Sequence, residues 1–236
     1  FLVNETILLD AGTGVGILSL NELQQIRHIL VTHSHLDHVA SIAFMADSLF
    51  ETTTTPILVH TSEETIAALK THLFNNILWP DFTTLVNPLG IKVIEFVPFS
   101  SDAPITIDGL SIEMIPVSHT VPAVGYRIES GTHSFAYTGD TMTNDTFWEA
   151  INRHQKLDML ITECAFPVEM KEIAALSKHY DPDTLAADLN KLEIKTKVFL
   201  THFKPGKEET ILNDLRERVR DIRINPLMQD DTYQLK

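Results

Sequence analysis

One octapeptide of the 236-residue chain, VTHSHLDH at residues 31–38, gathers four side chains that can bind a metal ion. It directly follows an apolar run that predicts a strand. Because alternate residues of a strand point to the same face, a strand that ends here would aim His33 and His35 in one direction. The turn behind it would aim Asp37 and His38 at a second point nearby. Zinc accepts imidazole nitrogen and carboxylate oxygen together, so this pattern favours a metal site over a solvated, histidine-rich loop.

Further acidic and histidine side chains follow other apolar runs of the sequence. Each is the first titratable residue after a predicted strand, and together they are Asp10, His119, Asp140, Glu163 and His202. In sheet proteins, the carboxyl ends of strands at one edge form a natural ligand site. We therefore expect these residues to gather with the octapeptide in one crevice, with Asp10 as the hydrogen-bonding partner of a ligating histidine.

The number of ligand-type side chains fits two metal ions. We divide seven of them between the ions, with His33, His35 and His119 on one, Asp37, His38 and His202 on the other, and Asp140 as the bridge. An open coordination position at each ion is typical of a catalytic site rather than a structural one. A hydroxide shared by two ions roughly 3.5–4 Å apart would be a nucleophile at neutral pH.

The elements that must position these residues follow from the spacing of apolar positions. Strands are predicted at residues 6–9, 28–32, 56–60, 91–97, 105–107, 110–117, 124–129, 134–138, 158–162 and 197–201. Helices are predicted at residues 21–25, 39–50, 144–154 and 207–220, and directly after 61–64 and 181. Thr61 and Glu64 fit a capping box, and Asp181 with Pro182 fits a second helix start. The stretch 163–179 is predicted to be a loop.

Composition and charge limit the class of partner. The chain has 44% hydrophobic residues, enough for the core of one continuous domain over residues 1–236. With 18 Lys and Arg against 32 Asp and Glu, the net charge of −14 should repel polymeric nucleic acid. A small anionic substrate remains compatible, because bound cations reverse the local field. The single cysteine, Cys164, excludes an intramolecular disulfide.

The ends of the chain and its hydropathy bear on location. No apolar run approaches the length of a transmembrane helix, so no membrane partner is expected. The chain opens at Phe1 with a strand-like segment, from which we expect a truncated N-terminal strand or a processed form. We expect a cytoplasmic protein, or a periplasmic one if a signal peptide was removed. A homodimer is compatible with the sequence.

At its ligand-type residues the chain resembles the metallo-β-lactamase superfamily of hydrolases. The octapeptide has the H-x-H-x-D-H pattern of that superfamily, and His119, Asp140 and His202 follow in the order of its later ligand motifs. The resemblance runs from Asp10 to beyond His202. It implies an αββα sandwich, in which two mixed sheets carry helices on their outer faces and the metals lie at one edge. Two divalent ions are expected, zinc first, with iron or manganese as alternatives that this ligand set also accepts.

Within the superfamily the chain is most similar to the class II cyclic-nucleotide phosphodiesterases. Three segments carry this likeness beside the octapeptide, namely residues 72–81, 163–167 and 201–205. The likeness implies that a metal-bridging hydroxide hydrolyses a nucleoside 3′,5′-cyclic phosphate, cyclic AMP or cyclic GMP, to the 5′-monophosphate.

The same resemblance suggests roles for individual residues. Asp37 counts among the catalytic groups as well as the ligands. His179 is expected to protonate the leaving 3′ oxygen, with Glu163 orienting it, although a loop histidine beside a helix start is the alternative. Substrate contacts are expected from Asn75, Trp79, Phe166 and Lys204. For the aromatic side chains among them, packing alone is the simpler explanation.

Three other functions are compatible with the same ligands. A tRNA 3′-processing endonuclease-like enzyme is the first, but the strong acidity and the lack of a basic arm count against it. A thioester or lactam hydrolase is the second, because the ligands alone do not separate these chemistries. A metal-dependent binding or redox module is the third, and the open coordination positions favour an enzyme over it.

Overall fold

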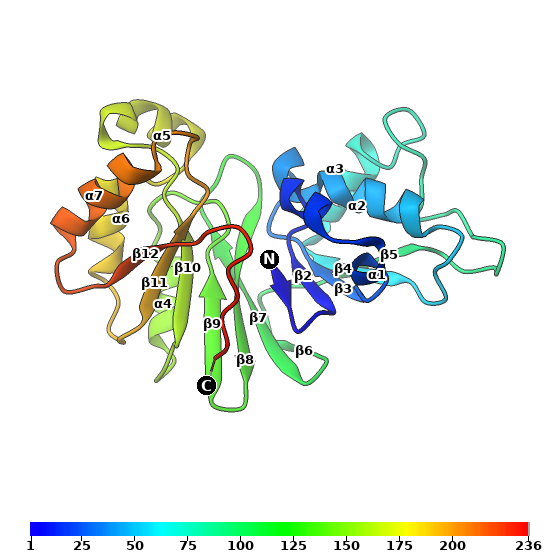
Figure 1. The fold of residues 1–236 in the computed structure, drawn as a ribbon, viewed down its shortest axis with the longest axis horizontal. Coiled ribbons are helices and arrows are strands. Elements are labelled where there is room, and N and C mark those ends of the chain that lie inside the picture. The colour runs from blue at the N-terminus through cyan, green and yellow to red at the C-terminus, as the bar shows by residue number, and fades with distance from the viewer. Residues whose placement is uncertain (236) are drawn as a thin grey trace. The chain divides into compact units, whose positions relative to one another are not determined.

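The computed structural model describes residues 1–235, which divide into two compact units at Ser100 and Ser101 (Figure 1). Each unit has its own sheet, helices and hydrophobic core. Both sheets contain parallel and antiparallel neighbours, so the predicted mixed α/β fold with two mixed sheets is confirmed. That the two units behave as one domain stays a prediction. No helix among residues 1–235 is long and apolar enough to cross a membrane.

The first unit is built on one mixed sheet. Its strands, in spatial order, are β1 (Leu2–Val3), β2 (Ile7–Leu9), β3 (His28–Leu30), β4 (Ile57–Thr61) and β5 (Ile94–Pro98). β1 and β2 are antiparallel, whereas the neighbours from β2 to β5 are parallel. The parallel strands β2 and β3 therefore end at the same edge, where Asp10 and the octapeptide follow them.

Helices cover one face of this sheet. They are the 3₁₀ helix η1 (Thr13–Ile17), α1 (Leu20–Leu23), α2 (Leu36–Leu49) and α3 (Glu63–His72), and Figure 1 shows α2 and α3 on one side of the strands. The apolar residues of α2, such as Ile42 and Met45, share one core cluster with Ile29 of β3 and Val59 of β4. Burial of this helical stripe sets the orientation of α2, and with it the orientation of the octapeptide.

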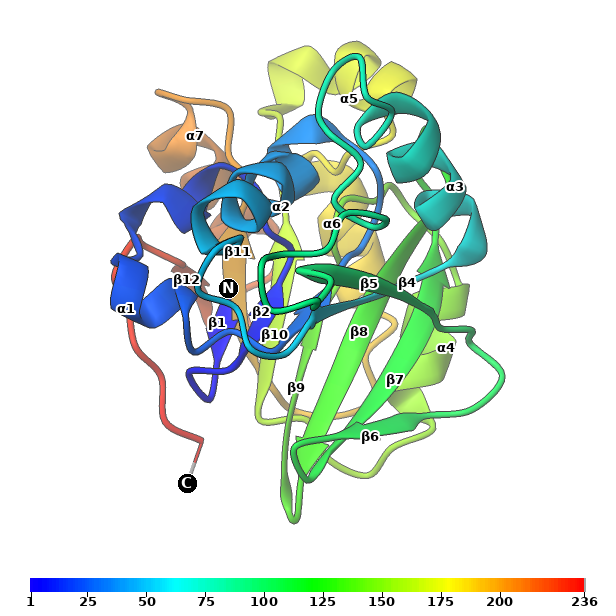
Figure 2. The same ribbon diagram turned by 90° about the vertical axis from the view of Figure 1, so that its right-hand side faces the viewer.

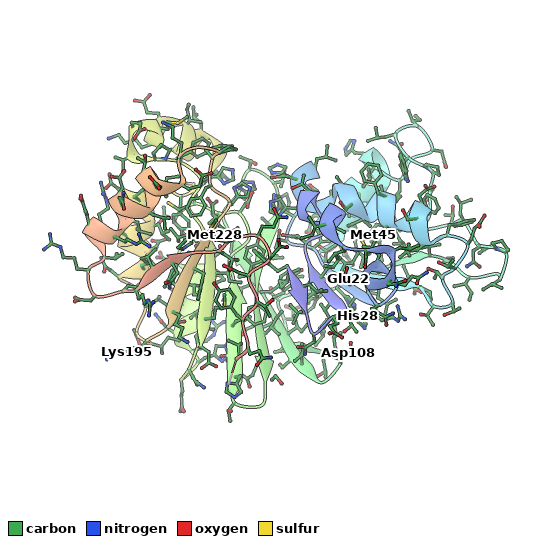
Figure 3. The ribbon with its side chains drawn as sticks, viewed as in Figure 1. Glu22, His28, Met45, Asp108, Lys195 and Met228 are labelled. Atoms are coloured by element: carbon green, nitrogen blue, oxygen red, sulfur yellow. The ribbon has the colours of Figure 1, made fainter. Side chains whose placement is uncertain are left out.

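The second unit contains the larger sheet. Its strands, in spatial order, are β12 (Ile224–Pro226), β11 (Lys197–Thr201), β10 (Met159–Glu163), β9 (His133–Tyr137), β8 (Ala123–Ser130), β7 (Leu110–Val117) and β6 (Ile105–Ile107). β6 to β9 form an antiparallel meander, whose long strands lie side by side in Figure 2, and β9 to β12 are parallel. Asp108 and Gly109 make the turn between β6 and β7 with positive φ values of 49° and 79° (Asp108 is labelled in Figure 3).

The helices of the second unit are α4 (Thr146–Asn152), the 3₁₀ helix η2 (Val168–Met170), α5 (Lys171–Ser177), α6 (Pro182–Leu189) and α7 (Glu208–Arg218). Residues of α4, α6 and α7, including Trp148, Leu185 and Ile211, share a core cluster with Leu160 of β10 and Val198 of β11. The parallel strands β9, β10 and β11 end at one edge, where Asp140, Glu163 and His202 stand.

Most predicted elements are present with shifts of a few residues, but two predictions are wrong and one strand was missed. Residues 163–179 are not one loop, because they contain η2 and α5; Ala174 is the one buried residue of α5, so its apolar periodicity is weak. The predicted capping box at Thr61 is absent: Ser62 caps α3 by accepting from the N–H of Thr65, while Thr61 ends β4. The short strand β12, which lies at the sheet edge and contains Pro226, was not predicted.

Candidate metal centre and catalytic groups

The octapeptide lies between the end of β3 and the first turn of α2. His35 stands directly before the helix, and Asp37 and His38 lie in its first turn. The ring centroid of His33 is 4.6 Å from that of His35 and 4.3 Å from that of His38. The carboxylate of Asp37 approaches Nε2 of His38 to 3.7 Å. The structure therefore brings these four side chains together, as their spacing predicts, and their binding of metal stays a prediction.

Gly12 allows the loop after β2 to approach the start of α2. A Cβ atom at this position would lie 1.5 Å from the carbonyl oxygen of Asp37, so only glycine fits. Beside it, the N–H of Ala11 donates to the carbonyl of His38 at 2.8 Å. This backbone contact holds the preceding residue, Asp10, next to the octapeptide.

Asp10 is the buried carboxylate that orients two of the histidines. It accepts from Nδ1–H of His38 at 2.7 Å and from the backbone N–H of Thr32 at 2.7 Å. The hydroxyl of Thr32 donates to Asp10 at 2.9 Å, so its oxygen accepts from Nδ1–H of His33 at 2.9 Å. In both imidazoles Nδ1 therefore carries the proton and Nε2 the lone pair, which is the form that binds a metal ion.

His119 follows β7 by two residues and is held through a contact with Lys178. Its Nδ1–H donates to the backbone carbonyl of Lys178 at 3.0 Å, and the ammonium of Lys178 donates to the carbonyl of His119 at 2.8 Å. The tautomer of His119 is thus the same as in His33 and His38. Both bonds lie within the second unit.

Asp140 and His202 stand after β9 and β11, the two parallel strands that flank β10. Asp140 is 2% exposed and follows Gly139, whose φ of 61° turns the chain after the strand. His202 directly follows β11, and its own φ is 60°. Nε2 of His202 lies 3.3 Å from Oδ2 of Asp140. The structure therefore brings these two predicted ligands into contact.

Glu163 ends β10, between those two strands, and is fully buried. Its Oε1 accepts from Nδ1–H of His179 at 2.7 Å and from the N–H of Thr141 at 2.9 Å. Its Oε2 accepts from the N–H groups of Ala165 and Tyr180. Burial raises the pKa of the Glu163 carboxyl well above its usual value and the charge of Asp140 adds to this rise, whereas the N–H donors favour the carboxylate.

His179 is placed by this carboxylate against two other imidazoles. Its ring stacks on that of His202, with centroids 5.2 Å apart and an interplanar angle of 19°, and lies 5.0 Å from that of His119. Ligand-type atoms of Glu163, His179 and His202 lie within 4.8 Å of one another. The pairing of His179 with Glu163, which the resemblance implied, is thus present.

The four expected substrate contacts differ in how accessible they are. Asn75 uses its side chain inside its own loop, accepting from the N–H groups of Ile77 and Leu78. Trp79 is half-buried and packs edge-on against Phe44, with centroids 5.4 Å apart, and its indole N–H has no hydrogen-bond partner among residues 1–235.

Phe166 and Lys204 touch each other in the second unit. Phe166 is 4% exposed, and the ammonium of Lys204 lies 4.8 Å from its ring centroid in a cation–π contact. The ring centroid of Phe166 also lies 5.8 Å from that of His179. Phe166 thus supports His179, and the exposed Lys204 is the more accessible of the two.

Three residues that orient candidate ligands or catalytic groups were not identified from the sequence. They are Thr32, Thr141 and Lys178, which contact His33, Glu163 and His119 respectively. The one available signal was position, because Thr32 and Lys178 each directly precede a singled-out histidine. Threonine and lysine are common surface residues, so position alone could not distinguish them.

The donor set of each unit fits divalent metal ions. Histidines with Nδ1 hydrogen-bonded and Nε2 bearing the lone pair, together with carboxylates, are the ligands that zinc, iron and manganese share. The first unit offers His33, His35, Asp37 and His38, and the second offers His119, Asp140 and His202. The hydrogen bonds of Asp10 and Lys178 are of the kind that support metal ligands in proteins.

Comparison with known proteins gives the family. A family model described as "Beta-lactamase superfamily domain" matches residues 5–203. A protein of Yersinia pestis named probable 3′,5′-cyclic-nucleotide phosphodiesterase is 27% identical over 209 residues, which cover 79% of this chain and 59% of the relative. A ribonuclease Z of Methanococcus maripaludis is 33% identical over 103 residues, which cover 43% of this chain and 31% of the relative. The chain thus spans less than two thirds of the length of either relative.

Among solved structures, the fold is similar to that of unliganded yeast PDE1. The TM-score is 0.77 at 22% identity, and the match covers 89% of this chain and 69% of the yeast chain. At this identity the likeness establishes the fold alone.

Proposed function

The chain belongs to the beta-lactamase superfamily, and from this premise we propose that it is a metal-dependent phosphodiesterase. Its proposed reaction converts a nucleoside 3′,5′-cyclic phosphate, cyclic AMP or cyclic GMP, to the 5′-monophosphate. The observation that carries the proposal is the 2.7 Å bond between Glu163 and His179 beside His202. A histidine held in this way is a general acid for a poor leaving group such as a ribose 3′ alkoxide.

We propose that seven side chains supply the ligands of two divalent ions, zinc first and iron or manganese as alternatives. They are His33, His35, Asp37, His38, His119, Asp140 and His202. The hydrogen bonds that set the tautomers of His33, His38 and His119 support this assignment. When bound, such ions neutralise phosphate charge and lower the pKa of water, which is the chemistry a phosphodiester requires.

The protein's own groups handle the proton of the reaction. A water oxygen attacks phosphorus and loses a proton to solvent, while the bond from phosphorus to the 3′ oxygen breaks. Glu163 accepts from Nδ1–H of His179, which leaves Nε2–H of the imidazolium as the proton that can pass to the departing 3′ oxygen. Asp37 acts in this scheme as both a ligand and a catalytic group.

Substrate contacts are proposed for two residues in particular. The exposed ammonium of Lys204 is suited to a phosphate oxygen, and the half-buried ring of Trp79 is suited to a base. Asn75 and Phe166 contribute by shaping the loop and by supporting His179. The substrate is proposed to be small and anionic and the protein to be cytoplasmic; a homodimer is compatible with both.

A second candidate is a tRNA 3′-processing endonuclease, favoured by the likeness to ribonuclease Z. The net charge of −14 opposes it, because an RNA polymer is bound mainly through its phosphates. A thioester or lactam hydrolase has no specific observation in its favour.

One substrate panel tests the proposal. The zinc-loaded protein is given cyclic AMP, cyclic GMP, a bis-aryl phosphodiester, a precursor tRNA and a thioester under the same conditions. We expect turnover of a cyclic nucleotide with the 5′-monophosphate as product, and none with Asp140→Ala. Preference for the precursor tRNA or the thioester would overturn the proposed function.

A further inference from the structure

We propose that Lys178 is a positioning residue that holds the candidate ligand His119 in its metal-binding orientation. The inference rests on the proposed metal-dependent function and goes beyond it, because it assigns the role to a lysine outside the ligand set. The ammonium and the backbone carbonyl of Lys178 both bond to His119.

Two hydrogen bonds of opposite direction join the residues. Nδ1–H of the His119 imidazole donates to the carbonyl of Lys178 at 3.0 Å, and the Lys178 ammonium donates to the carbonyl of His119 at 2.8 Å. One bond sets the tautomer and angle of the ring, and the other ties the backbone that carries the ring. Together they restrain both the ring and the backbone of His119.

The backbone of Lys178 supports a role for its side chain. Its φ and ψ of 53° and 52° are left-handed, at the end of α5, where glycine is the usual residue. The N–H groups of Lys178 and His179 bond back to the carbonyls of Ala175 and Ala174, which is the hydrogen-bond pattern of a helix ending at glycine. A lysine in this left-handed conformation is strained, and backbone strain of this kind is retained where the side chain has a function.

The same turn also connects His119 to the candidate general acid. His179 is the next residue, and its ring lies 5.0 Å from that of His119. A shift of Lys178 would therefore disturb both His119 and His179. The two hydrogen bonds between Lys178 and His119 thus fix the position of the His119 ring relative to the His179 ring.

Variants of Lys178 separate this role from that of an ordinary helix end. Lys178→Met removes the ammonium and keeps the strained backbone. Lys178→Gly removes the ammonium and also relieves the backbone strain. Lys178→Arg keeps a cation at this position. Lys171→Met is the matched control, because it removes an exposed lysine from the first residue of the same helix. Lys178 borders a surface hollow of about 430 Å³, so water can satisfy the His119 carbonyl and the variants should fold.

The first measurement is zinc affinity by chelator competition, alongside the unfolding midpoint. We expect Lys178→Met and Lys178→Gly to bind zinc roughly 10- to 100-fold more weakly, with Lys178→Arg recovering most of the loss. The midpoint of Lys178→Gly should be unchanged or raised, since glycine relieves the left-handed strain. Zinc affinities of both variants within twofold of the wild type and of Lys171→Met would overturn the proposal.

The second measurement needs no metal and therefore decides the matter even if the wild type takes up no zinc. Imidazole ¹⁵N chemical shifts of the metal-free protein report which nitrogen of His119 carries the proton. We expect Nδ1–H in the wild type and a mixture of tautomers in Lys178→Met, because without the ammonium the His119 backbone is no longer tied and its ring loses its alignment with the Lys178 carbonyl. Identical shifts in the two proteins would contradict the role of Lys178, whereas a wild type that hydrolyses no cyclic nucleotide would contradict the proposed function alone.

Discussion

The carboxylate of Asp10 holds Nδ1 of His38 at 2.7 Å although the two residues are 28 positions apart in the chain. Through the hydroxyl of Thr32, the same carboxylate also determines the tautomer of His33. One buried acid thus orients two of the candidate ligands in the first unit.

Asp10→Asn should weaken zinc binding roughly 10- to 100-fold, because a neutral amide then replaces the carboxylate that supports both imidazoles. Chelator competition measures the effect. Thr32→Val is the matched comparison, since it breaks the link to His33 and leaves the bond to His38, and its loss should be smaller. Equal zinc affinity in Asp10→Asn and the wild type would contradict the orienting role.

His179→Ala should slow cyclic AMP hydrolysis by roughly 10²- to 10⁴-fold, the range expected for loss of a general acid. A bis-aryl phosphodiester, whose leaving group needs no proton, should lose far less. Steady-state rates on both substrates provide the comparison, with Glu163→Gln expected to show the same pattern in weaker form. Equal losses on both substrates would remove His179 from the protonation step.

Removal of the metal should abolish turnover, and added zinc should restore it. His35→Ala and Asp140→Ala should each lower both bound metal and activity, because each removes a proposed ligand. Elemental analysis beside the activity assay checks this. Full activity in protein that contains no metal would exclude the proposed mechanism.

Gly12→Ala should destabilise the fold by about 3 kcal/mol, because the added Cβ meets a backbone oxygen that cannot move aside. Gly14→Ala is the control, since a Cβ there has no atom within 4 Å. Urea unfolding of both variants gives the two free energies. Similar stabilities would show that the start of α2 can shift to accept the methyl group.

His60 should make the protein less stable in mild acid. It is buried on β4, 3.0 Å from the His28 ring (His28 is labelled in Figure 3), and burial with the nearby His28 lowers the pKa of His60 from 6.5 to about 4. The unfolded chain therefore takes up a proton first as the pH falls below 6.5. The resulting destabilisation grows between pH 6.5 and pH 4, and at pH 5 it is about 2 kcal/mol.

Urea unfolding at pH 7.5 and pH 5 tests this dependence. His60→Gln, which does not titrate, should lose less stability between the two pH values than the wild type does. His72→Gln, at an exposed histidine of α3, serves as the control and should behave as the wild type. A pH dependence that survives in His60→Gln would assign the effect to other groups.

Much of the local structure could be predicted because it depends on neighbours in the chain. The strands at 105–107, 110–117 and 197–201 have the predicted bounds, since apolar alternation or a short apolar run indicates a strand without reference to the rest of the fold. Asp181 caps α6 with Pro182 in its first turn, as predicted, because capping is also local. α5 and β12 escaped prediction because each is short and only weakly patterned.

By itself the sequence determined which side chains are of ligand type and that they follow strand ends, because both are properties of contiguous residues. The tertiary structure decided which nitrogen of each imidazole carries the proton and which carboxylate faces which histidine. Lys178 and His119 are 59 residues apart in the chain. Many pairs of residues at that separation make no contact, and no sequence pattern indicates that these two do. Such bonds exist because the fold brings strand ends, and here the end of α5, next to one another, and that adjacency belongs to the fold rather than to any stretch of sequence.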